Sequence, residues 1–144
     1  MKKFLDYGNY YITILKLKLF RKKINNLANQ IALNGLTYLD KYAISNLIHA
    51  IDKITRKRVQ GIWLEAGTAL GGSAILISAL KQPGQSLHLF DTFTMIPTPN
   101  IKDGDDVHLR YKEIIEGRSK AINQNLYSDY LDDLFSQVKD NFIK

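Results

Sequence analysis

Apolar positions in the first half of the chain recur at the spacing of an amphipathic helix, in two consecutive stretches. The first runs from Ile24 to Leu33 and is followed by Gly35, a residue that commonly ends a helix. The second covers residues 43–54 and ends in a basic run, which suits the negative end of a helix dipole. The pattern therefore predicts two successive helices.

The boundaries of these helices are less sharply marked. Thr37 is the expected N-cap of the second helix, because Asp40 follows three residues later as in a capping box. Residues 1–23 mix aromatic, apolar and basic side chains without a clean period, so both helix and strand stay open there.

Between Gly61 and Asp91 the pattern changes to two short apolar runs separated by a glycine-rich segment. The run Ile62-Trp63-Leu64 is continuous, as expected for a parallel strand covered on both faces. A helix of roughly two to three turns follows, then a Pro83-Gly84 break and a second strand over residues 86–90. The order predicts the first half of a nucleotide-binding strand–helix–strand unit.

The residue types of this unit fit a ligand. Gly67 allows a sharp turn and a close approach to the backbone, and Gly71 and Gly72 continue the open path. Ser73 is the expected cap of the helix, whose positive end faces the ligand. Asp91 lies 24 positions after Gly67, close to the spacing of about 20 at which an acid binds a ribose diol. A glycine-rich turn without a ligand is the alternative.

Two prolines in the loop at residues 92–100 exclude regular structure there. A helix is expected over residues 107–115, with three acids before it and Gly117 after it. Ser128 is the expected cap of a last helix, whose apolar face comprises Leu131, Leu134, Phe135, Val138 and Phe142.

The sequence gives no strong indication that His108 binds a metal or that His88 acts as a catalytic base. Asp105 and His108 have a spacing that two metal ligands can take, but no third ligand is evident nearby, so no metal site is assigned. His88, inside the second strand, is expected to be packed or hydrogen-bonded rather than to act as a base.

Composition is that of an ordinary globular domain, with 144 residues, 45% hydrophobic residues and no cysteine. These features, with no apolar run long enough to cross a membrane, lead us to expect a cytoplasmic protein. The net charge of +6 is uneven, because residues 1–60 hold 12 Lys/Arg against 3 Asp/Glu. The basic run at residues 16–23 is read as a solvated helix face; binding to an anionic membrane or to nucleic acid is the alternative.

The glycine turn matches neither Gly-x-Gly-x-x-Gly nor the P-loop pattern. Glu-x-Gly-x-x-x-Gly-Gly-Ser, with an acid ending the next strand, resembles motifs I and II of class I S-adenosylmethionine methyltransferases. Residues from Leu36 to Phe142 resemble the N-terminal part of the macrocin O-methyltransferase (TylF-like) family. This resemblance rests on GIWLEAGTALGGSAI at 61–75, FDTFTMIPTP at 90–99 and KDGDDVH at 102–108.

The resemblance implies a role for each matching residue. Glu65, Ala66 and Gly67 would line the amino-acid end and ribose of S-adenosylmethionine, and residues 95–99 would edge the cleft. The expected cofactor-binding residues are Glu65, Ala66, Gly67, Thr68, Gly71, Gly72, Ser73, Asp91, Thr92 and Phe93. Of these, Thr68 and Gly71 to Ser73 would form the turn, and Asp91 would bind the ribose. Thr92 and Phe93 would lie beside the adenosine.

The family implies a reaction as well: methylation of a hydroxyl, often on a sugar of a secondary metabolite, usually with a divalent metal such as magnesium. Its metal-binding and catalytic acids lie on later strands that have no counterpart here, so catalytic residues stay unknown and metal ligands none. We therefore expect a partial Rossmann-like α/β fold, consisting of helices followed by strand, helix, strand and helix. It would be the cofactor half of a truncated or split methyltransferase.

The expected organisation is a basic helical arm at residues 1–35 and a cofactor-binding part at residues 36–144. Two parallel strands leave unpaired edges, so a homo-oligomer or a complementing chain is expected beside the small-molecule methyl acceptor. Nucleic acid and membrane are not expected partners. The alternative is a non-catalytic remnant, or a docking module that needs a second chain to complete its fold.

Overall fold

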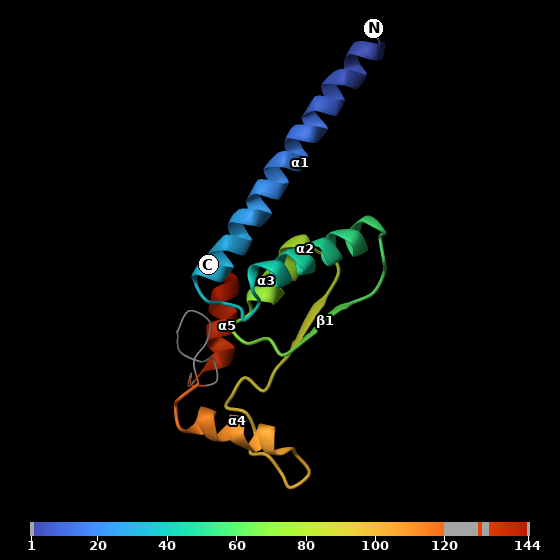
Figure 1. Ribbon diagram of the computed structural model, residues 1–144. Helices are drawn as coiled ribbons and strands as arrows, with labels where there is room; N and C mark the ends of the chain where they lie inside the picture. The colour runs from blue at the N-terminus through green and yellow to red at the C-terminus, as the bar shows by residue number, and fades with distance from the viewer. Residues whose placement is uncertain (1, 120–129, 131–132, 144) are drawn as a thin grey trace.

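The computed structural model describes residues 2–119, 130 and 133–143 as a mixed arrangement of helices and strands (Figure 1). In chain order these are α1 (Lys2–Leu33), α2 (Lys41–Arg56), β1 (Trp63–Ala66), α3 (Gly72–Leu80), β2 (Leu87–Phe90), α4 (Asp105–Ile115) and α5 (Leu134–Ile143). The expected strand–helix–strand order after two helices is therefore present.

Helix α1 includes the N-terminal stretch for which helix and strand were both open. It projects away from the other elements at its N-terminal end and joins them at its C-terminal end (Figure 1). Gly35 stops it as expected, with a φ of 65°. The amides of Gly35 and Leu36 donate back to the carbonyls of Ala32 and Ile31, at 3.1 and 3.0 Å, so the last turn is closed by its own backbone.

The N-cap of α2 is Asp40, so the expectation of Thr37 was wrong. The Oδ1 atom of Asp40 accepts from the amides of Tyr42 and Ala43, at 2.9 and 2.8 Å. Thr37 is buried instead, and its hydroxyl accepts from the amide of Leu39. A short carboxylate one residue before the helix reaches the free amides of the first turn better than a threonine four residues before it.

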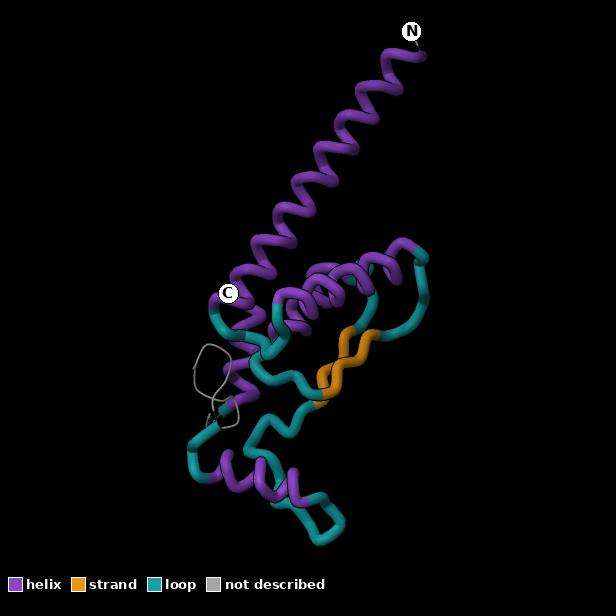
Figure 2. The backbone as a smooth tube through the Cα atoms, in the orientation of Figure 1, coloured by secondary structure: helices purple, strands orange, loops and turns teal. Residues whose placement is uncertain are grey.

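Strands β1 and β2 pair in parallel and form a two-stranded sheet (Figure 2). Trp63 lies opposite Leu87 and Ala66 lies opposite Phe90. The ladder continues at the carboxyl ends, where the amide of Gly67 donates to the carbonyl of Phe90 at 2.8 Å. The glycine turn after β1 and the acid after β2 therefore leave the sheet side by side.

Helices pack on one face of this sheet. Trp63 and Leu87 contact a buried cluster made by α1, α2 and α3, comprising Ile24, Ile51, Ile77 and Leu80. A second cluster joins the same three helices nearer the glycine turn, and comprises Ala28, Ile31, Ile44 and Leu76. The periodic apolar stripes predicted for the first two helices thus form the core, together with α3.

The opposite face of the sheet is not covered by any of the described residues. Ile62, Leu64 and Phe90 are 66%, 59% and 55% exposed. A strand covered on both faces was predicted from Ile62-Trp63-Leu64, and this prediction was wrong, because the side chains alternate and only one face meets the helices. His88 shares the open face and is exposed, and its ring makes no hydrogen bond with the described residues, so the prediction that it would be packed or hydrogen-bonded was also wrong.

The remaining helices lie beyond the carboxyl ends of the strands (Figure 1). Helix α4 begins after Gly104 and ends near Gly117, as expected, but buries only Ile114. Helix α5 buries Leu134 and Val138. Ser128 and Leu131, the expected cap and first apolar position of the last helix, lie outside the described residues.

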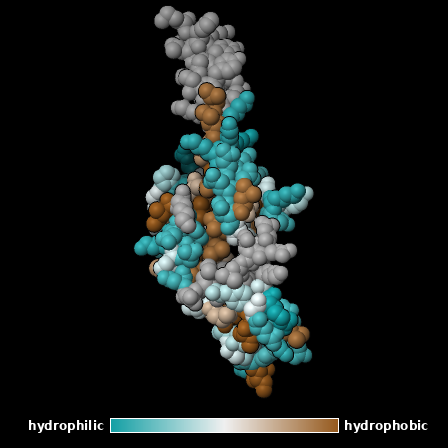
Figure 3. All heavy atoms as spheres, turned by 90° about the vertical axis from the view of Figure 1, so that its left-hand side faces the viewer, coloured by the Kyte–Doolittle hydropathy of each residue, from teal (hydrophilic) through white to brown (hydrophobic). Residues whose placement is uncertain are grey.

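Apolar surface emerges in several separate patches on the face shown in Figure 3. One of them lies at the lower end, where Figure 1 places α4 and the loop before it. That loop and helix include Ile101, which is 98% exposed, and Leu109, which is 65% exposed. Across the described chain, no helix combines the length and the apolar character that a membrane crossing requires.

Candidate functional site

The turn between β1 and α3 alternates left-handed residues with ordinary ones. Gly67, Ala69 and Gly71 have φ values of 81°, 46° and 86°. Two glycines take this conformation at little cost, whereas Ala69 holds it against the steric clash of its Cβ. A non-glycine residue kept in this region needs a fixed partner, and the structure provides one in Asp91.

The carboxylate of Asp91 reaches across from the end of β2 to the backbone of the turn. Its Oδ2 atom accepts from the amides of Thr68 and Ala69, at 2.6 and 3.2 Å. Its Oδ1 atom accepts from the amide of Phe93 at 3.0 Å and from the hydroxyl of Thr92 at 3.4 Å. Phe93 is itself left-handed, with a φ of 52°. Asp91 therefore fixes two strained segments, one on each side of the site.

These hydrogen bonds set the charge state of Asp91. Burial alone would raise its pKa, but the amides of Phe93, Thr68 and Ala69 and the hydroxyl of Thr92 together outweigh burial and lower it. The sequence predicted that this acid would lie beside the glycine turn, and the structure places it there. It did not predict that the acid would already bond to the backbone of the turn.

Glu65 lies on the helix-covered face of β1, next to the turn. The hydroxyl of Ser73 donates to its Oε1 atom. Ser73 was expected to cap α3, and this was wrong: the N-cap is Gly71, without a side-chain hydrogen bond, and Ser73 lies in the first helical turn. Its hydroxyl points back to the strand instead, because residues early in α3 face the end of β1.

The second oxygen of Glu65 has no hydrogen-bond partner among the described residues, although it is buried. Burial raises the pKa of Glu65, Ser73 opposes the shift, and the nearby charge of Asp91 adds to it. Thr68, only 2% exposed, lies in the same turn, and its buried hydroxyl also has no hydrogen-bond partner in the part of the chain that the structure describes. Buried polar atoms of this kind are normally hydrogen-bonded, so both groups can accept from or donate to a bound polar molecule.

Helix α5 packs against the other side of the turn. The side-chain amide of Asn141 donates to the carbonyl of Leu70 at 3.0 Å. A Cβ on Gly71 would lie 3.3 Å from Val138 and 3.4 Å from Phe142. The ring of Phe135 meets that of Phe93 edge to face, with centroids 5.5 Å apart. The apolar pattern of α5 predicted a buried face, but nothing in it indicated that this face would hold the turn.

The remaining expected site residues surround the same turn. Ala66 is exposed at the carboxyl end of β1, and the backbone of Gly72 donates to the carbonyl of Leu36 at 2.8 Å. The loop that was expected to edge the cleft leads away to α4, where the hydroxyls of Thr98 and Tyr111 lie 3.0 Å apart.

Asp103, before α4, and His108, within it, both contact Asn100 in the preceding loop. Asp103 accepts from the amide of Asn100 at 2.7 Å, and the ring of His108 lies 3.1 Å from the carbonyl of the same residue. Among the residues that the structure describes, no three acids or histidines are grouped so that they could hold a metal ion.

A parallel strand–helix–strand unit with a glycine turn, and an acid that closes on it from the second strand, makes this chain a mixed α/β protein. In α/β proteins with open sheets, ligands commonly bind at this carboxyl edge of the sheet. The family model for Macrocin-O-methyltransferase (TylF) matches residues 8–142, and the chain belongs to this family. At the level of the family, it is an O-methyltransferase. Neither the curated proteins nor the solved structures give a match.

Proposed function

We propose that the turn between β1 and α3, together with Glu65 and Asp91, binds the S-adenosylmethionine of an O-methyltransferase reaction. The observation that carries this proposal is the buried oxygen of Glu65 beside an open glycine turn. A buried carboxylate oxygen without a partner is costly, and a bound cation or donor would remove that cost. Family membership supports the choice of this cofactor over other nucleotides.

The residues present fit the amino-acid end of the cofactor. A Cβ built on Gly67 meets nothing within 4 Å, so space exists directly above the turn. The α-ammonium of the cofactor would donate to the free oxygen of Glu65, while Ser73 keeps the other oxygen in place. A charge-assisted hydrogen bond of this kind, partly shielded from water, is stronger than one between neutral groups.

Asp91 can bind the ribose only if it gives up one of its present hydrogen bonds. Its two oxygens already accept from three backbone amides and one hydroxyl. Binding a ribose diol would exchange the longest of these contacts, the one from the Thr92 hydroxyl, for a hydroxyl of the cofactor. The amide of Phe93 and the turn amides would keep the carboxylate oriented and charged during the exchange.

S-adenosylmethionine would supply an electrophilic methyl group. Glu65, Asp91 and the glycine turn would hold this cofactor in place and would not activate the acceptor. The positive end of α3 and the glycine turn orient the donor, and Glu65 fixes its amino-acid end. We propose a small-molecule hydroxyl, on a sugar or a secondary metabolite, as the acceptor. None of the described residues is assigned as a catalytic base or as a magnesium ligand.

Calorimetric titration with S-adenosylhomocysteine and with 5′-methylthioadenosine tests the assignment, because only the first ligand has the amino-acid end. Glu65→Gln should weaken S-adenosylhomocysteine about tenfold or more, as expected for a lost charge-assisted hydrogen bond, and leave 5′-methylthioadenosine unchanged. Asp91→Asn should weaken both ligands, because both have the ribose.

The control variant is Asp105→Asn, which removes an exposed carboxylate from the first turn of α4. It should bind both ligands like the wild type. Equal losses of both ligands in Glu65→Gln would contradict the role given to that residue. A folded wild type that binds neither ligand would contradict the cofactor proposal as a whole.

A second candidate function is a docking module that is completed by another polypeptide. The open face of the sheet, with Ile62, Leu64 and Phe90 more than half exposed, favours it. The same titrations separate the two candidates, because a docking module without a cofactor would give no heat with either ligand and would still associate through this face.

A further inference from the structure

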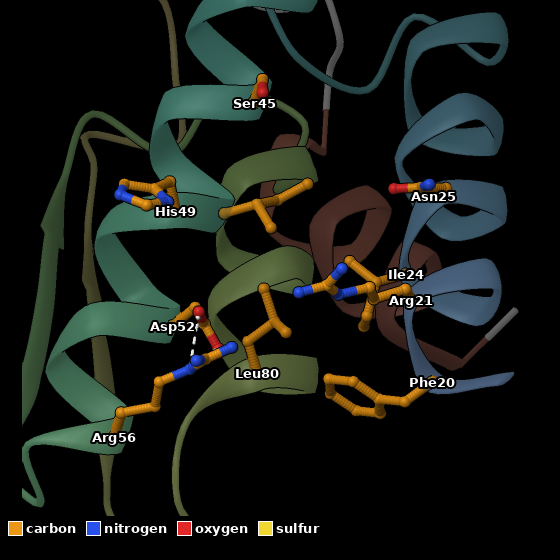
Figure 4. Close-up of a pocket in the computed structure, with 10 residues that line it drawn as sticks. Phe20, Arg21, Ile24, Asn25, Ser45, His49, Asp52, Arg56 and Leu80 are labelled. Atoms are coloured by element: carbon orange, nitrogen blue, oxygen red, sulfur yellow. Dashed lines mark hydrogen bonds and ion pairs between the residues drawn. The ribbon is translucent and has the colours of Figure 1, made fainter. Parts of the chain in front are cut away.

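A groove of about 600 Å³ lies between α1 and α2, with the end of α3 as its floor (Figure 4). This volume is within the usual range for small-molecule sites. Ten residues from the three helices line it, comprising Phe20, Arg21, Ile24, Asn25, Ser45, Ile48, His49, Asp52, Arg56 and Leu80.

The groove is separate from the glycine turn. None of the residues that line it belongs to the turn or to the loop after β2. Leu80 is the last residue of α3, whereas Gly72 is the first, so the length of a nine-residue helix, about 12 Å, separates the two places. A ligand in the groove would therefore leave the cofactor turn free.

The floor of the groove is apolar. Ile24 and Leu80 are buried at 7% and 8% exposure, and Ile48 packs partly buried against the same core cluster. Phe20 stands at the rim and is 48% exposed. Such a floor can cover one face of a hydrocarbon chain or of a flat ring, and remove it from water.

The walls carry an unbalanced positive charge. Arg56 on α2 is bonded to Asp52 one turn earlier, with Nε and Oδ2 2.9 Å apart. Arg21 comes from α1 and points into the groove in Figure 4. It has no ion-pair partner among the described residues, since the ion pairs there are Asp52–Arg56, Arg110–Glu113 and Glu116–Arg118. The lining thus holds two arginines against one aspartate.

We propose that this groove binds a small amphipathic anion, whose apolar part lies on Ile24, Ile48 and Leu80 and whose carboxylate or phosphate pairs with Arg21. A planar guanidinium presents two parallel donors that match either head group. The uncompensated charge on the wall opposite the Asp52–Arg56 pair selects an anion over a neutral compound of the same shape.

Calorimetric titration with decanoate, decanol and inorganic phosphate tests both halves of the ligand. Decanoate should bind the wild type at least tenfold more tightly than either decanol or phosphate, because only decanoate uses the floor and Arg21 together. Arg21→Gln should bring decanoate down to about the affinity of decanol. Decyl phosphate, titrated in parallel, shows which head group the groove prefers.

Lys23→Gln is the matched control. It removes the same charge from an exposed residue of α1 that does not line the groove and that lies about 200° further around the helix. It should leave decanoate binding unchanged. Ser45→Phe, at an exposed position on the other wall, should fill the groove and weaken decanoate and decanol alike.

Three results would overturn the proposal. They are equal affinities of decanoate and decanol, equal losses in Arg21→Gln and Lys23→Gln, and unchanged binding in Ser45→Phe. Circular dichroism of each variant shows that it is folded before it is titrated. Binding of S-adenosylhomocysteine, measured on the same samples, should be unaffected by Arg21→Gln, so a failure of this proposal is distinguishable from a failure of the cofactor assignment.

Discussion

Glu65 and Asp91 lie beside the same turn, but the pKa of Glu65 is raised and that of Asp91 is lowered. The difference comes from their hydrogen-bond partners. Asp91 accepts from three amides and a hydroxyl, which lower its pKa although burial opposes them. Glu65 is buried with a single donor, Ser73, and its pKa is raised. The first acid therefore fixes the backbone, whereas the second has one buried oxygen without a hydrogen-bond partner among the described residues.

The shift of Glu65 predicts how stability depends on pH. A folded-state pKa above 4.5 means that the folded chain holds this proton more tightly than the unfolded chain. The resulting stabilisation is complete below pH 4.5 and is lost as the pH rises through the folded pKa. Glu65→Gln should therefore melt at a higher temperature than the wild type at pH 7, and the difference should shrink towards pH 4.5.

Thermal melts of both proteins from pH 4 to pH 8 measure this difference. Asp105→Asn, which removes an exposed carboxylate, should not reproduce it. A stabilisation that is the same at every pH would show that the buried charge of Glu65 is not its cause.

Gln85 joins the start of the sheet to the loop before it. Its Oε1 atom accepts from the indole of Trp63 at 2.8 Å, and its amide donates to the carbonyl of Val59 at 3.1 Å. Gln85→Ala should cost about 1–3 kcal/mol, because it leaves a partly buried indole N–H without its acceptor.

Urea unfolding measures the loss in Gln85→Ala. Fluorescence reports on it as well, since Trp63 is the only tryptophan and its emission should shift to the red as water reaches the ring. Gln137→Ala, at an exposed position of α5, is the control and should change neither quantity. An unchanged emission maximum in Gln85→Ala would contradict the role of this bond.

At the scale of elements, the start of α3 is held from two sides. The amide of Gly72 donates to the carbonyl of Leu36, in the segment between α1 and α2. Gly71 faces Val138 and Phe142 of α5. The glycine turn is therefore positioned by helices from both ends of the chain, and its shape depends on their packing as well as on its own sequence.

Alanine substitutions at three glycines of this region should destabilise the protein more, the less space the structure leaves around each glycine. Gly67→Ala meets no neighbour and costs about 1–2 kcal/mol for its left-handed backbone. Gly71→Ala adds contacts at 3.3 and 3.4 Å from α5 and should cost more. Gly72→Ala places its Cβ 2.6 Å from the Leu36 carbonyl, a backbone atom, and should be the most destabilising.

Urea unfolding of the three variants gives the ranking. Gly117→Ala, left-handed and open like Gly67 but remote from the turn, serves as the control for backbone cost alone. If Gly72→Ala were no worse than Gly67→Ala, the segment at Leu36 would not hold α3 as described.

At the scale of the whole molecule, the helices that the structure describes cover one face of the sheet and leave the other open. Three helices pack against Trp63 and Leu87, which are partly buried, while Ile62, Leu64 and Phe90 stay largely exposed on the other face. Two parallel strands with open edges and an open apolar face are unusual, because parallel sheets are normally covered on both sides. We therefore expect the isolated chain to associate at higher concentration.

Leu64→Lys should lower this association, because it places a charge in the middle of the open face. Sedimentation velocity across a tenfold range of concentration measures the effect. Leu109→Lys, which adds the same charge at a comparably exposed position on α4, should leave association as it is in the wild type. Equal effects of the two variants would point to net charge rather than to this face of the sheet.

The local pattern of the sequence was enough to predict the helices over residues 24–33 and 43–54, the two strands, and the position of Asp91 beside the glycine turn. These features follow from the period of apolar residues and from the short distances along the chain. The resemblance in residues 61–75 and 90–99 predicted the family, and the family model confirmed it.

Only the tertiary structure decided what these residues contact. Ser73 bonds to Glu65 rather than capping α3, Asp91 binds the backbone of the turn, and α5 packs on Gly71. Which face of the sheet is covered also depends on how the helices fold back. Each of these contacts joins residues on different elements, and the sequence pattern of one element does not specify which surface of another it will meet.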